Sequence, residues 1–382
     1  MNIIISAIFS NGRIFLSSPT ILLFFILLFQ SSCGNRFVRN KEARDDAREM
    51  ELAVASNMKI KNSISAQVET DPVYAVNVDN DTADDPAIWY NDVKPEASII
   101  FGSNKKHGIH SYNLKGEEVQ YVPCGTINNI DVRKAINFSG GKYDVLAGSH
   151  RFNNSIVLFT IDQNGIIKST PDFEIGLPDF DPYGFCLYKN EKGKLYAFIN
   201  NKNGEIYQVS IDIDPNGFLK SDVVNQFKLK TQVEGMVVDD EYGKLFVGEE
   251  QSGIYLFDLK AKNIKGQLLK GSTNANRNIR YDVEGLALIN SKFLIASSQG
   301  NFSYAIYNLD SESYITSFKI IDGSNDAVEE TDGLEVSTLP FGQLFPKGIL
   351  VVQDGFNYDG KVKKAQNFKI VDLREVDKFL DK

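Results

Sequence analysis

Residues 233–250 contain two strand-like runs, Val233-Glu234-Gly235-Met236-Val237 and Leu245-Phe246-Val247-Gly248-Glu249-Glu250, on either side of the polar stretch Asp239-Asp240-Glu241-Tyr242-Gly243. Both runs are rich in residues that favour strands, and each carries acidic residues near one end. The polar stretch has the composition of a solvent-facing turn, so the two runs predict an antiparallel hairpin.

The same unit recurs along the chain at intervals of about 50 residues, a period typical of propeller blades. In all six copies a polar or acidic cluster opens the first run, and a polar patch closes the second. The first runs begin at residues 84, 128, 181, 233, 283 and 331, and the second at 99, 144, 195, 245, 293 and 348. We therefore expect an all-β fold, a six-bladed β-propeller of four-stranded antiparallel blades.

The two ends of the repeat region predict how the ring closes. After the sixth copy the chain supplies one more strand, residues 367–371, and then a charged tail. The last blade therefore lacks a strand, which the apolar residues 73–78 ahead of the first cluster can supply. Because this pairing removes an open sheet edge, we predict that residues 72–79 close the sixth blade.

The first residues resemble an export signal. An apolar run at residues 21–29 has the length of a signal-peptide core, and Arg13 precedes it. The following Gln30-Ser31-Ser32-Cys33-Gly34 resembles a bacterial lipoprotein signal, in which the cysteine is lipidated, although Gln30 departs from the usual branched apolar residue. We expect an exported cell-envelope lipoprotein, on the outer membrane or the periplasmic face. Ordinary secretion and an uncleaved anchor are the alternatives.

This interpretation divides the chain into three parts. Residues 1–33 are the expected signal peptide, residues 34–68 a polar tether, and residues 69–382 the propeller domain. Cys124 and Cys186 remain in the domain, and we expect both thiols to be unpaired. A monomer with no membrane contact except its lipid is expected.

Composition limits the ligands. The formal net charge of the 382-residue chain is −9, which argues against nucleic-acid binding and suits a protein that binds cations through carboxylates. With three histidines in all, a histidine-rich transition-metal site is not expected.

Topology predicts where the polar clusters meet. The first strand of each hairpin starts at the end of the blade where the second strand finishes, so both motifs converge on one mouth of the ring. The strand starts supply Asp84, Asp85, Asn129, Asp131, Tyr183, Glu234, Asp282, Glu284 and Asp332. The strand ends supply Asn104, Lys105, His150, Arg151, Lys202, Glu249, Glu250, Gln299 and Asp354.

This mixture of charges predicts a metal-assisted reaction on an anion. Crowded carboxylates need compensating cations, and oxygen-only ligands suit calcium. Lys105, Arg151 and Lys202 beside such a site suit phosphate. A water acidified by calcium could attack phosphorus directly, since no G-x-S-x-G elbow or P-loop is present.

Each feature also has a structural interpretation when taken singly. Acidic residues before a strand often form turns, Lys105 could be a solvated loop charge, and Tyr183 could be a packing aromatic. The convergence of all six clusters on one rim favours the functional interpretation.

Several ordered blocks of the chain resemble the β-propeller phytases of bacteria, across roughly residues 70 to 375. The blocks are residues 84–89, 231–236 with 239–243, 282–286, 296–301 with 303–307, and 366–371. The resemblance implies a calcium-requiring 3-phytase that releases phosphate from phytate and has two adjacent phosphate sites.

The resemblance also implies residue roles. The implied calcium ligands are Asp84, Asp85, the Pro86 carbonyl, Asn129, Glu234, Glu250, Asp282, Glu284, Gln299 and Asp332. The implied phosphate-contacting residues are Lys105, Arg151, Tyr183 and Lys202, and these four together with Glu234 and Glu250 form the expected catalytic set. Asn203, where an acid is common, and residues 326–330, in place of a more regular Asp/Gly loop, depart from the family pattern.

Two other functions fit parts of the pattern. A calcium-dependent lactonase or esterase could use the same propeller, but Lys105, Arg151 and Lys202 weigh against it. A non-catalytic surface-binding propeller could hold calcium only as a structural ion.

Overall fold

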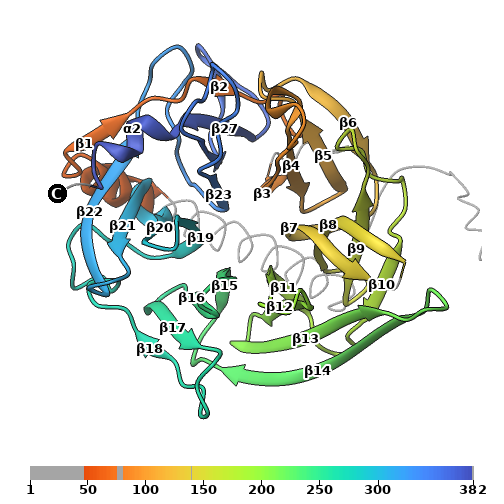
Figure 1. Cartoon of the computed structure of the whole chain (residues 1–382). Helices are drawn as coiled ribbons and strands as arrows, with labels where there is room; N and C mark the ends of the chain where they lie inside the picture. Colours follow the sequence, from red (N-terminus) through yellow and green to blue (C-terminus); the bar gives the residue numbers. More distant parts are fainter. Residues whose placement is uncertain (1–46, 75–80, 139, 381–382) are drawn as a thin grey trace, which may run out of the picture. The chain divides into compact units, whose positions relative to one another are not determined.

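The computed structural model describes residues 47–74, 81–138 and 140–380. The chain divides into two compact units, residues 1–51 and 52–382. In the first unit only residues 47–51 are described, and they are helical. The second unit contains six four-stranded antiparallel blades around a common axis, which confirms the expected six-bladed β-propeller (Figure 1).

The blades follow one another along the chain, with the first strand of each at the axis. Blade 1 comprises β3 (Ala83–Trp89), β4 (Ile99–Asn104), β5 (Gly108–Tyr112) and β6 (Glu118–Val122). Blade 2 comprises β7 (Ile127–Phe138), β8 (Gly141–His150), β9 (Ser155–Ile161) and β10 (Phe173–Gly176). Blade 3 comprises β11 (Pro182–Lys189), β12 (Leu195–Asn201), β13 (Glu205–Ile213) and β14 (Leu219–Lys228).

The second half of the ring has the same plan. Blade 4 comprises β15 (Val233–Asp239), β16 (Lys244–Glu249), β17 (Gly253–Asp258) and β18 (Gln267–Leu268). Blade 5 comprises β19 (Val283–Ile289), β20 (Phe293–Ser298), β21 (Ser303–Asn308) and β22 (Ser313–Ile320), and β1 (Asn62–Ile64) adds a parallel fifth strand. Blade 6 comprises β23 (Leu334–Ser337), β24 (Ile349–Asp354), β27 (Asn367–Asp372) and β2 (Val68–Glu69).

The remaining elements are short. The hairpin β25 (Tyr358–Asp359) and β26 (Val362–Lys363) lies between β24 and β27 in the chain, and α2 (Leu373–Asp377) follows β27. Two single turns of 3-10 helix cover Pro95–Ala97 and Gln299–Asn301. Among the described residues, no helix has the length and apolar character needed to cross a membrane.

The core lies between adjacent blades rather than within any one of them. Successive side chains of a strand point to opposite faces of its sheet, and both faces of each blade are covered. On β11, Phe185 and Leu187 pack toward blade 2, whereas Cys186 and Tyr188 pack toward blade 4. The inner strands are therefore largely apolar, and most of their polar residues lie at their first positions, with exceptions such as Asp131 and Arg133 on β7.

The strand that closes the ring lies earlier in the sequence than predicted. β2 pairs with β27, with Val68 opposite Ile370, and the Thr70 N–H continues the pairing through a bond to the Phe368 carbonyl at 2.8 Å. Of the expected closing strand, Val73 still donates to Gln366 (2.8 Å), and residues 75–80 lie outside the described part of the chain. The prediction that residues 72–79 form the closing strand was therefore wrong, because the pairing with β27 runs through residues 68–70. Pro72 has no N–H and cannot donate a hydrogen bond to the ladder.

The domain also begins before the boundary expected at residue 69. Residues 52–57 are helical and β1 pairs with β22, so both elements fall in the stretch assigned to a tether. Ala53, Ile60 and Ile64 of this stretch are buried. Most of their neighbours in the sequence are polar, so the overall composition of this stretch resembles that of a tether. The start of the domain was therefore predicted too far along the chain.

The two cysteines of the domain form no disulfide within the described residues. Cys186 is buried on β11, and Cys124 is partly buried in the loop before β7. Burial raises the pKa of the Cys124 thiol to about 12, so it remains protonated at neutral pH.

Candidate active site

Five of the six inner strands contain a β-bulge at the cluster that the sequence singled out. The bulge leaves two residues of the inner strand opposite a single step of its neighbour, and such irregularities redirect side chains. The bulged pairs are Asp84-Asp85, Asn128-Asn129, Tyr183-Gly184, Glu234-Gly235 and Glu284-Gly285. In blade 6 the corresponding Asp332-Gly333 precedes β23, and the Gly333 N–H bonds to the Asp84 carbonyl at 3.0 Å.

The glycines of these pairs let neighbouring blades touch through their backbones. A Cβ atom on Gly184 would lie 1.9 Å from the Glu234 carbonyl oxygen, and one on Gly235 would lie 1.9 Å from the Glu284 carbonyl oxygen. No side chain fits at either position. The first residues of the pairs, all of them polar or acidic, are therefore held around a narrow mouth.

A second set of side chains belongs to the residues that follow the second strand of each blade. Their N–H groups bond back to the residue before the inner strand: Lys105 to Thr82 (2.9 Å), Arg151 to Thr126 (3.0 Å) and Glu250 to Gln232 (3.1 Å). The shared pattern places these positions at the same level of the ring. Blades 1 to 3 supply Lys105, Arg151 and Lys202 there, whereas blades 4 and 5 supply Glu250 and Gln299.

Three buried glutamates form the centre of the acidic part of the mouth. Oxygens of Glu234, Glu250 and Glu284 all lie within 4.8 Å of one another. Burial, together with Glu234, raises the pKa of Glu250 to about 7 and that of Glu284 well above its usual range. One oxygen of Glu284, Oε2, is buried without a hydrogen-bond partner. Such a group is ready to accept a cation.

Lys105 lies among the carboxylates of blades 1 and 6. Its ammonium is 2.8 Å from Asp81, 3.2 Å from Asp84 and 3.4 Å from Asp332. Burial raises the pKa of Asp84 to about 6 in spite of Lys105, because Glu234 adds repulsion. Lys105 itself is partly buried, but the three carboxylates outweigh the effect of burial and raise its pKa.

The remaining residues of the expected metal set lie beside this cluster. Gln299 donates a side-chain hydrogen bond to Asp332, and the Gln299 backbone N–H bonds to the Asp282 carbonyl at 2.9 Å. The Asp282 carboxylate lies close enough to Glu250 to raise the pKa of that group further. The structure thus brings together Asp84, Glu234, Glu250, Asp282, Glu284, Gln299 and Asp332.

Tyr183 lies between two of the basic residues. The Lys202 ammonium is 4.4 Å from the centroid of its ring, and the Arg151 guanidinium carbon is 5.4 Å away. Burial and neighbouring carboxylates, first Glu234, raise the pKa of Tyr183, so its hydroxyl stays protonated and can donate a hydrogen bond. The ring therefore orients two cations with its faces, through cation–π contacts, and offers a donor at its edge.

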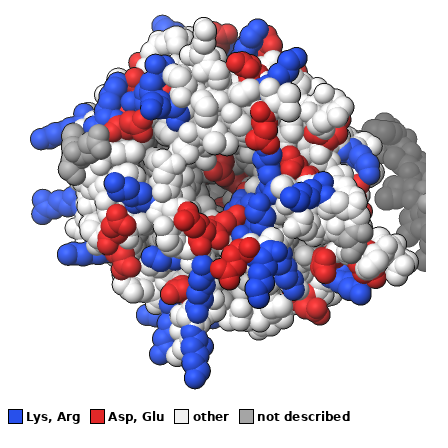
Figure 2. Space-filling model, in the orientation of Figure 1, with Lys and Arg blue, Asp and Glu red and all other residues white. Residues whose placement is uncertain are grey.

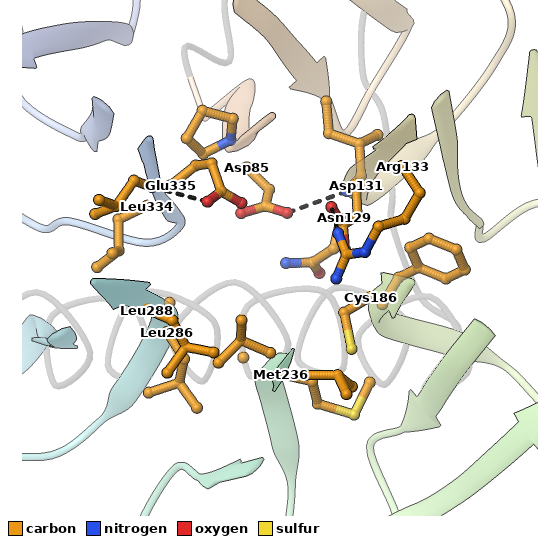
Figure 3. A pocket seen from close by; sticks show the side chains of 18 residues that line it. Asp85, Asn129, Asp131, Arg133, Cys186, Met236, Leu286, Leu288, Leu334 and Glu335 are labelled. Atoms are coloured by element: carbon orange, nitrogen blue, oxygen red, sulfur yellow. Dashed lines mark hydrogen bonds and ion pairs between the residues drawn. The ribbon is translucent and has the colours of Figure 1, made fainter. Parts of the chain in front are cut away.

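Asp85, Pro86 and Asn129 border this cluster on the channel side, and the Asn129 side-chain oxygen accepts at 2.9 Å from the Asn128 amide that also contacts Glu234. They line a cavity of about 200 Å³ inside the channel, with Asp131, Arg133 and Glu335 (Figure 3). Asp85 accepts from the Ile130 N–H at 3.1 Å, and burial followed by Asp84 raises its pKa. Burial followed by Asp131 raises the pKa of Glu335 to about 8. The sequence analysis did not predict that Asp85 and Asn129, the second residues of their bulges, would face a different part of the channel from the first residues.

The far end of the hairpin 233–250 is more buried than expected. Asp239 accepts from the N–H groups of Glu241 and Tyr242, so a turn forms there, but Asp239 itself is buried. Asp240 bonds to Arg133 at 2.9 Å and does not simply face solvent. Arg133 also bonds at 2.7 Å to Asp131 on its own strand, and the Arg133–Asp240 pair joins blades 2 and 4.

Three contributors to the mouth were missed by sequence reasoning. Asn128 donates to Glu234 at 2.9 Å, Gln232 donates to Glu250 at 2.6 Å, and Asp81 is the nearest carboxylate to Lys105. Asn128 occupies the bulge position equivalent to Glu234, so alignment of the repeats could have identified it in place of Asn129. Nothing in the pattern marked Gln232 or Asp81.

The mouth can hold divalent cations and an anion together. Carboxylates and an amide carbonyl supply oxygen ligands on one side, and an unpartnered buried oxygen of Glu284 fits a cation. Three cationic side chains, Lys105, Arg151 and Lys202, stand at the same level in the other blades. Figure 2 shows acidic and basic side chains gathered around one opening of the ring.

Comparison with known proteins shows which family has a similar sequence. A sequence model of the Phytase family matches residues 45–382. The 3-phytase of Bacillus subtilis (strain 168) is 38% identical over 330 residues, which cover 83% of this chain and 85% of that protein.

Two solved structures are more remote. Virginiamycin B lyase from Staphylococcus aureus is 13% identical, with a TM-score of 0.46 over 77% of this chain and 96% of the other. A protein of unknown function from Bacteroides caccae is also 13% identical, with a TM-score of 0.41 over 62% of this chain and 81% of the other.

Proposed function

Because this chain belongs to the phytase family and is a phosphoric monoester hydrolase, we propose that it hydrolyses phytate, myo-inositol hexakisphosphate, with the help of calcium ions. One observation carries the proposal. A buried glutamate cluster that can hold cations shares its mouth with Lys105, Arg151 and Lys202.

The basic residues are the phosphate-binding part. The guanidinium of Arg151 can bind two oxygens of one phosphate, and Lys202, which also contacts the Tyr183 ring, adds a point charge. The protonated Tyr183 hydroxyl can donate to a third oxygen. Lys105 lies in another blade, so it can contact a different oxygen or a neighbouring phosphate. Substrates with adjacent phosphates, such as phytate, suit this spread of cations.

The acidic residues are the cation-binding part. Glu234, Glu250, Glu284, Asp84, Asp282 and Asp332, with Gln299, would hold calcium through oxygen atoms, which this hard cation prefers. Asp85, the Pro86 carbonyl and Asn129 would hold a further ion deeper in the channel. Calcium, when bound, supplies Lewis acidity that activates water and offsets the charge developing on phosphorus.

The protein residues then determine the geometry of the reaction. Gln232 and Asn128 hold the carboxylates of Glu250 and Glu234 by hydrogen bonds of 2.6 and 2.9 Å. Arg151 and Lys202 orient the phosphate and stabilise its negative charge as the ester bond breaks. No side chain is required as a nucleophile, because water attacks phosphorus directly.

Phosphate release from phytate, with calcium or with excess chelator, tests the proposal. We expect release only with calcium, and slower release from simple phosphomonoesters than from phytate. Arg151→Ala should lose most of the activity while the calcium-dependent melting temperature is kept. Lys220→Ala, at an exposed lysine on β14, is the matched control and should behave as the wild type.

Other outcomes would point elsewhere. No release under either condition would favour a binding propeller, and cleavage of lactones or carboxylic esters alone would favour an esterase. Full activity in Arg151→Ala would contradict the role given to the basic residues.

We also propose that the protein is exported as a lipoprotein through Cys33 and acts as a monomer. The support is the apolar run and the Ser31-Ser32-Cys33 motif, which lie outside the described residues. Metabolic labelling with a fatty acid, compared between the wild type and Cys33→Ala, tests this part separately.

A further inference from the structure

The three basic residues of the mouth share a local arrangement. Each one directly follows the last residue of the second strand in its blade. That last residue pairs with the first residue of the inner strand in all three blades: Asn104 with Ala83, His150 with Ile127, and Asn201 with Pro182. Asn104, His150 and Asn201 are all buried. They are therefore equivalent positions, and each one controls the start of the turn that carries a cation.

In blades 1 and 3 the asparagine side chain holds this turn. Its Oδ1 atom accepts two backbone N–H groups from the residues just after the cation, as an Asx turn does. The donors are Lys106 (3.0 Å) and His107 (3.1 Å) in blade 1, and Asn203 (3.0 Å) and Glu205 (3.1 Å) in blade 3. Lys105 and Lys202 are thus presented by turns that an amide oxygen holds.

In blade 2 an imidazole holds the corresponding turn. The Nδ1 atom of His150 accepts the Asn153 N–H at 3.1 Å, and the turn between them carries Arg151. On the other side of the ring, Gly125 packs so closely that a Cβ there would lie 2.4 Å from Nε2. A ring nitrogen can accept only when it carries no proton, so this contact requires the neutral Nε2–H form.

We propose that His150 is a positioning residue for phosphate binding, whose neutral imidazole holds the turn that presents Arg151. It acts in blade 2 as Asn104 and Asn201 act in blades 1 and 3. The inference rests on the proposed function, because it takes Arg151 to be a phosphate ligand. It adds that one of the three cations is held by an imidazole, whose acceptor nitrogen is lost when the ring is protonated.

Protonation of His150 removes the acceptor of the Asn153 N–H and releases this turn. In the described residues, the charged and titratable groups around the ring are Glu174 on β10, Arg151 in the turn itself and Cys124 next to Gly125 in the β6–β7 loop. In blades 1 and 3 the acceptor is an amide oxygen, which acid does not protonate, although the Asn104 amide nitrogen also lies 3.2 Å from Nε2 of His110. Acid therefore removes the acceptor itself only in blade 2, at the turn of Arg151.

Two substitutions separate the acceptor from the ring. His150→Asn supplies the acceptor that blades 1 and 3 already use, whereas His150→Leu removes it. At about pH 8 we expect His150→Leu to raise KM for phytate about tenfold, the equivalent of about one hydrogen bond, with a smaller change in kcat. His150→Asn should retain the wild-type KM. A wild-type KM in His150→Leu, or the same loss in both variants, would overturn the proposal.

The pH profile supplies a readout that a purely structural role would not change. Between about pH 8 and pH 5 the wild-type KM should rise about tenfold more than that of His150→Asn, because only the wild type loses its acceptor. Both proteins share every other titrating group and the substrate. Parallel profiles would overturn the proposal.

Direct observation of the ring covers the case in which His150→Leu fails to fold. Nitrogen-15 NMR of histidine-labelled wild-type protein should show the Nε2–H tautomer for His150 at about pH 8, and the Nδ1–H tautomer would refute the proposed contact. If the wild type releases no phosphate from phytate, the proposed function fails instead, and the NMR result still decides the contact.

Discussion

Replacing Glu250 by glutamine should stabilise the metal-free protein at high pH. Burial and the neighbouring Glu234 raise the pKa of Glu250 from 4.5 to about 7. A group whose pKa is raised by folding contributes stability below its unfolded pKa and loses it as pH rises through the folded value. One pKa unit corresponds to about 1.4 kcal/mol, so ionised Glu250 destabilises the fold by about 3 kcal/mol at about pH 8. At about pH 5 the destabilisation of the fold by Glu250 is below about 1 kcal/mol.

Urea unfolding in excess chelator, at about pH 5 and about pH 8, measures this difference. Glu250→Gln keeps an acceptor for Gln232, which donates at 2.6 Å, so the substitution removes mainly the charge. We expect the variant to exceed the wild type by about 3 kcal/mol at the higher pH and to resemble it at the lower one. Calcium should reverse the order, since the wild type offers the better site and gains more from binding.

The adjacent Glu249 is the matched control, because its pKa is shifted in the opposite direction. Burial alone would raise it, but the Thr231 and Lys230 N–H groups, both at 2.7 Å, outweigh burial and lower it. Glu249→Gln should therefore destabilise the protein at about pH 8, with or without calcium. If Glu250→Gln is no more stable than the wild type in chelator, the mouth is not a site of repelling carboxylates and the reasoning fails.

Three further substitutions test separate features. Lys369→Met removes a fully buried ammonium that contacts Asp326, Glu69 (2.5 Å) and Asp354 (3.3 Å), and it should lower the free energy of unfolding by about 3–5 kcal/mol in urea titrations. Gly235→Ala places a Cβ against a backbone carbonyl at 1.9 Å and should cost about 3 kcal/mol or prevent folding, as circular dichroism would show. Tyr183→Leu removes the ring contacted by two cations and should raise KM for phytate about tenfold in phosphate-release assays, with an unchanged melting temperature.

Much of the architecture follows from the periodicity of the sequence. The six copies predicted six blades because each apolar run is long enough for one strand and both of its faces are buried between neighbours. The closing strand was misplaced because residues 73–78 look more like a strand than residues 67–70 do. The choice depends on which N–H groups lie opposite β27, and that is a tertiary property.

The sequence predicted which blades contribute residues to the site, but it did not predict the positions of individual side chains. Topology brought Glu234, Glu250 and Glu284 together, and the structure places their oxygens within 4.8 Å. It could not separate Asp84 from Asp85, because a bulge sends adjacent residues to different parts of the channel and leaves no mark in composition. The contact of Asn128 with Glu234 was hidden for the same reason.

Closure of the last blade by β2 has a consequence for biogenesis. The ring is complete only when β2 meets β27, which the ribosome makes long after β2. A nascent polypeptide held up before that point retains two bare sheet edges, each able to pair with another molecule. If the proposed export takes place in an extended form, that meeting is postponed until β27 has crossed the membrane, and the finished ring first forms on the far side.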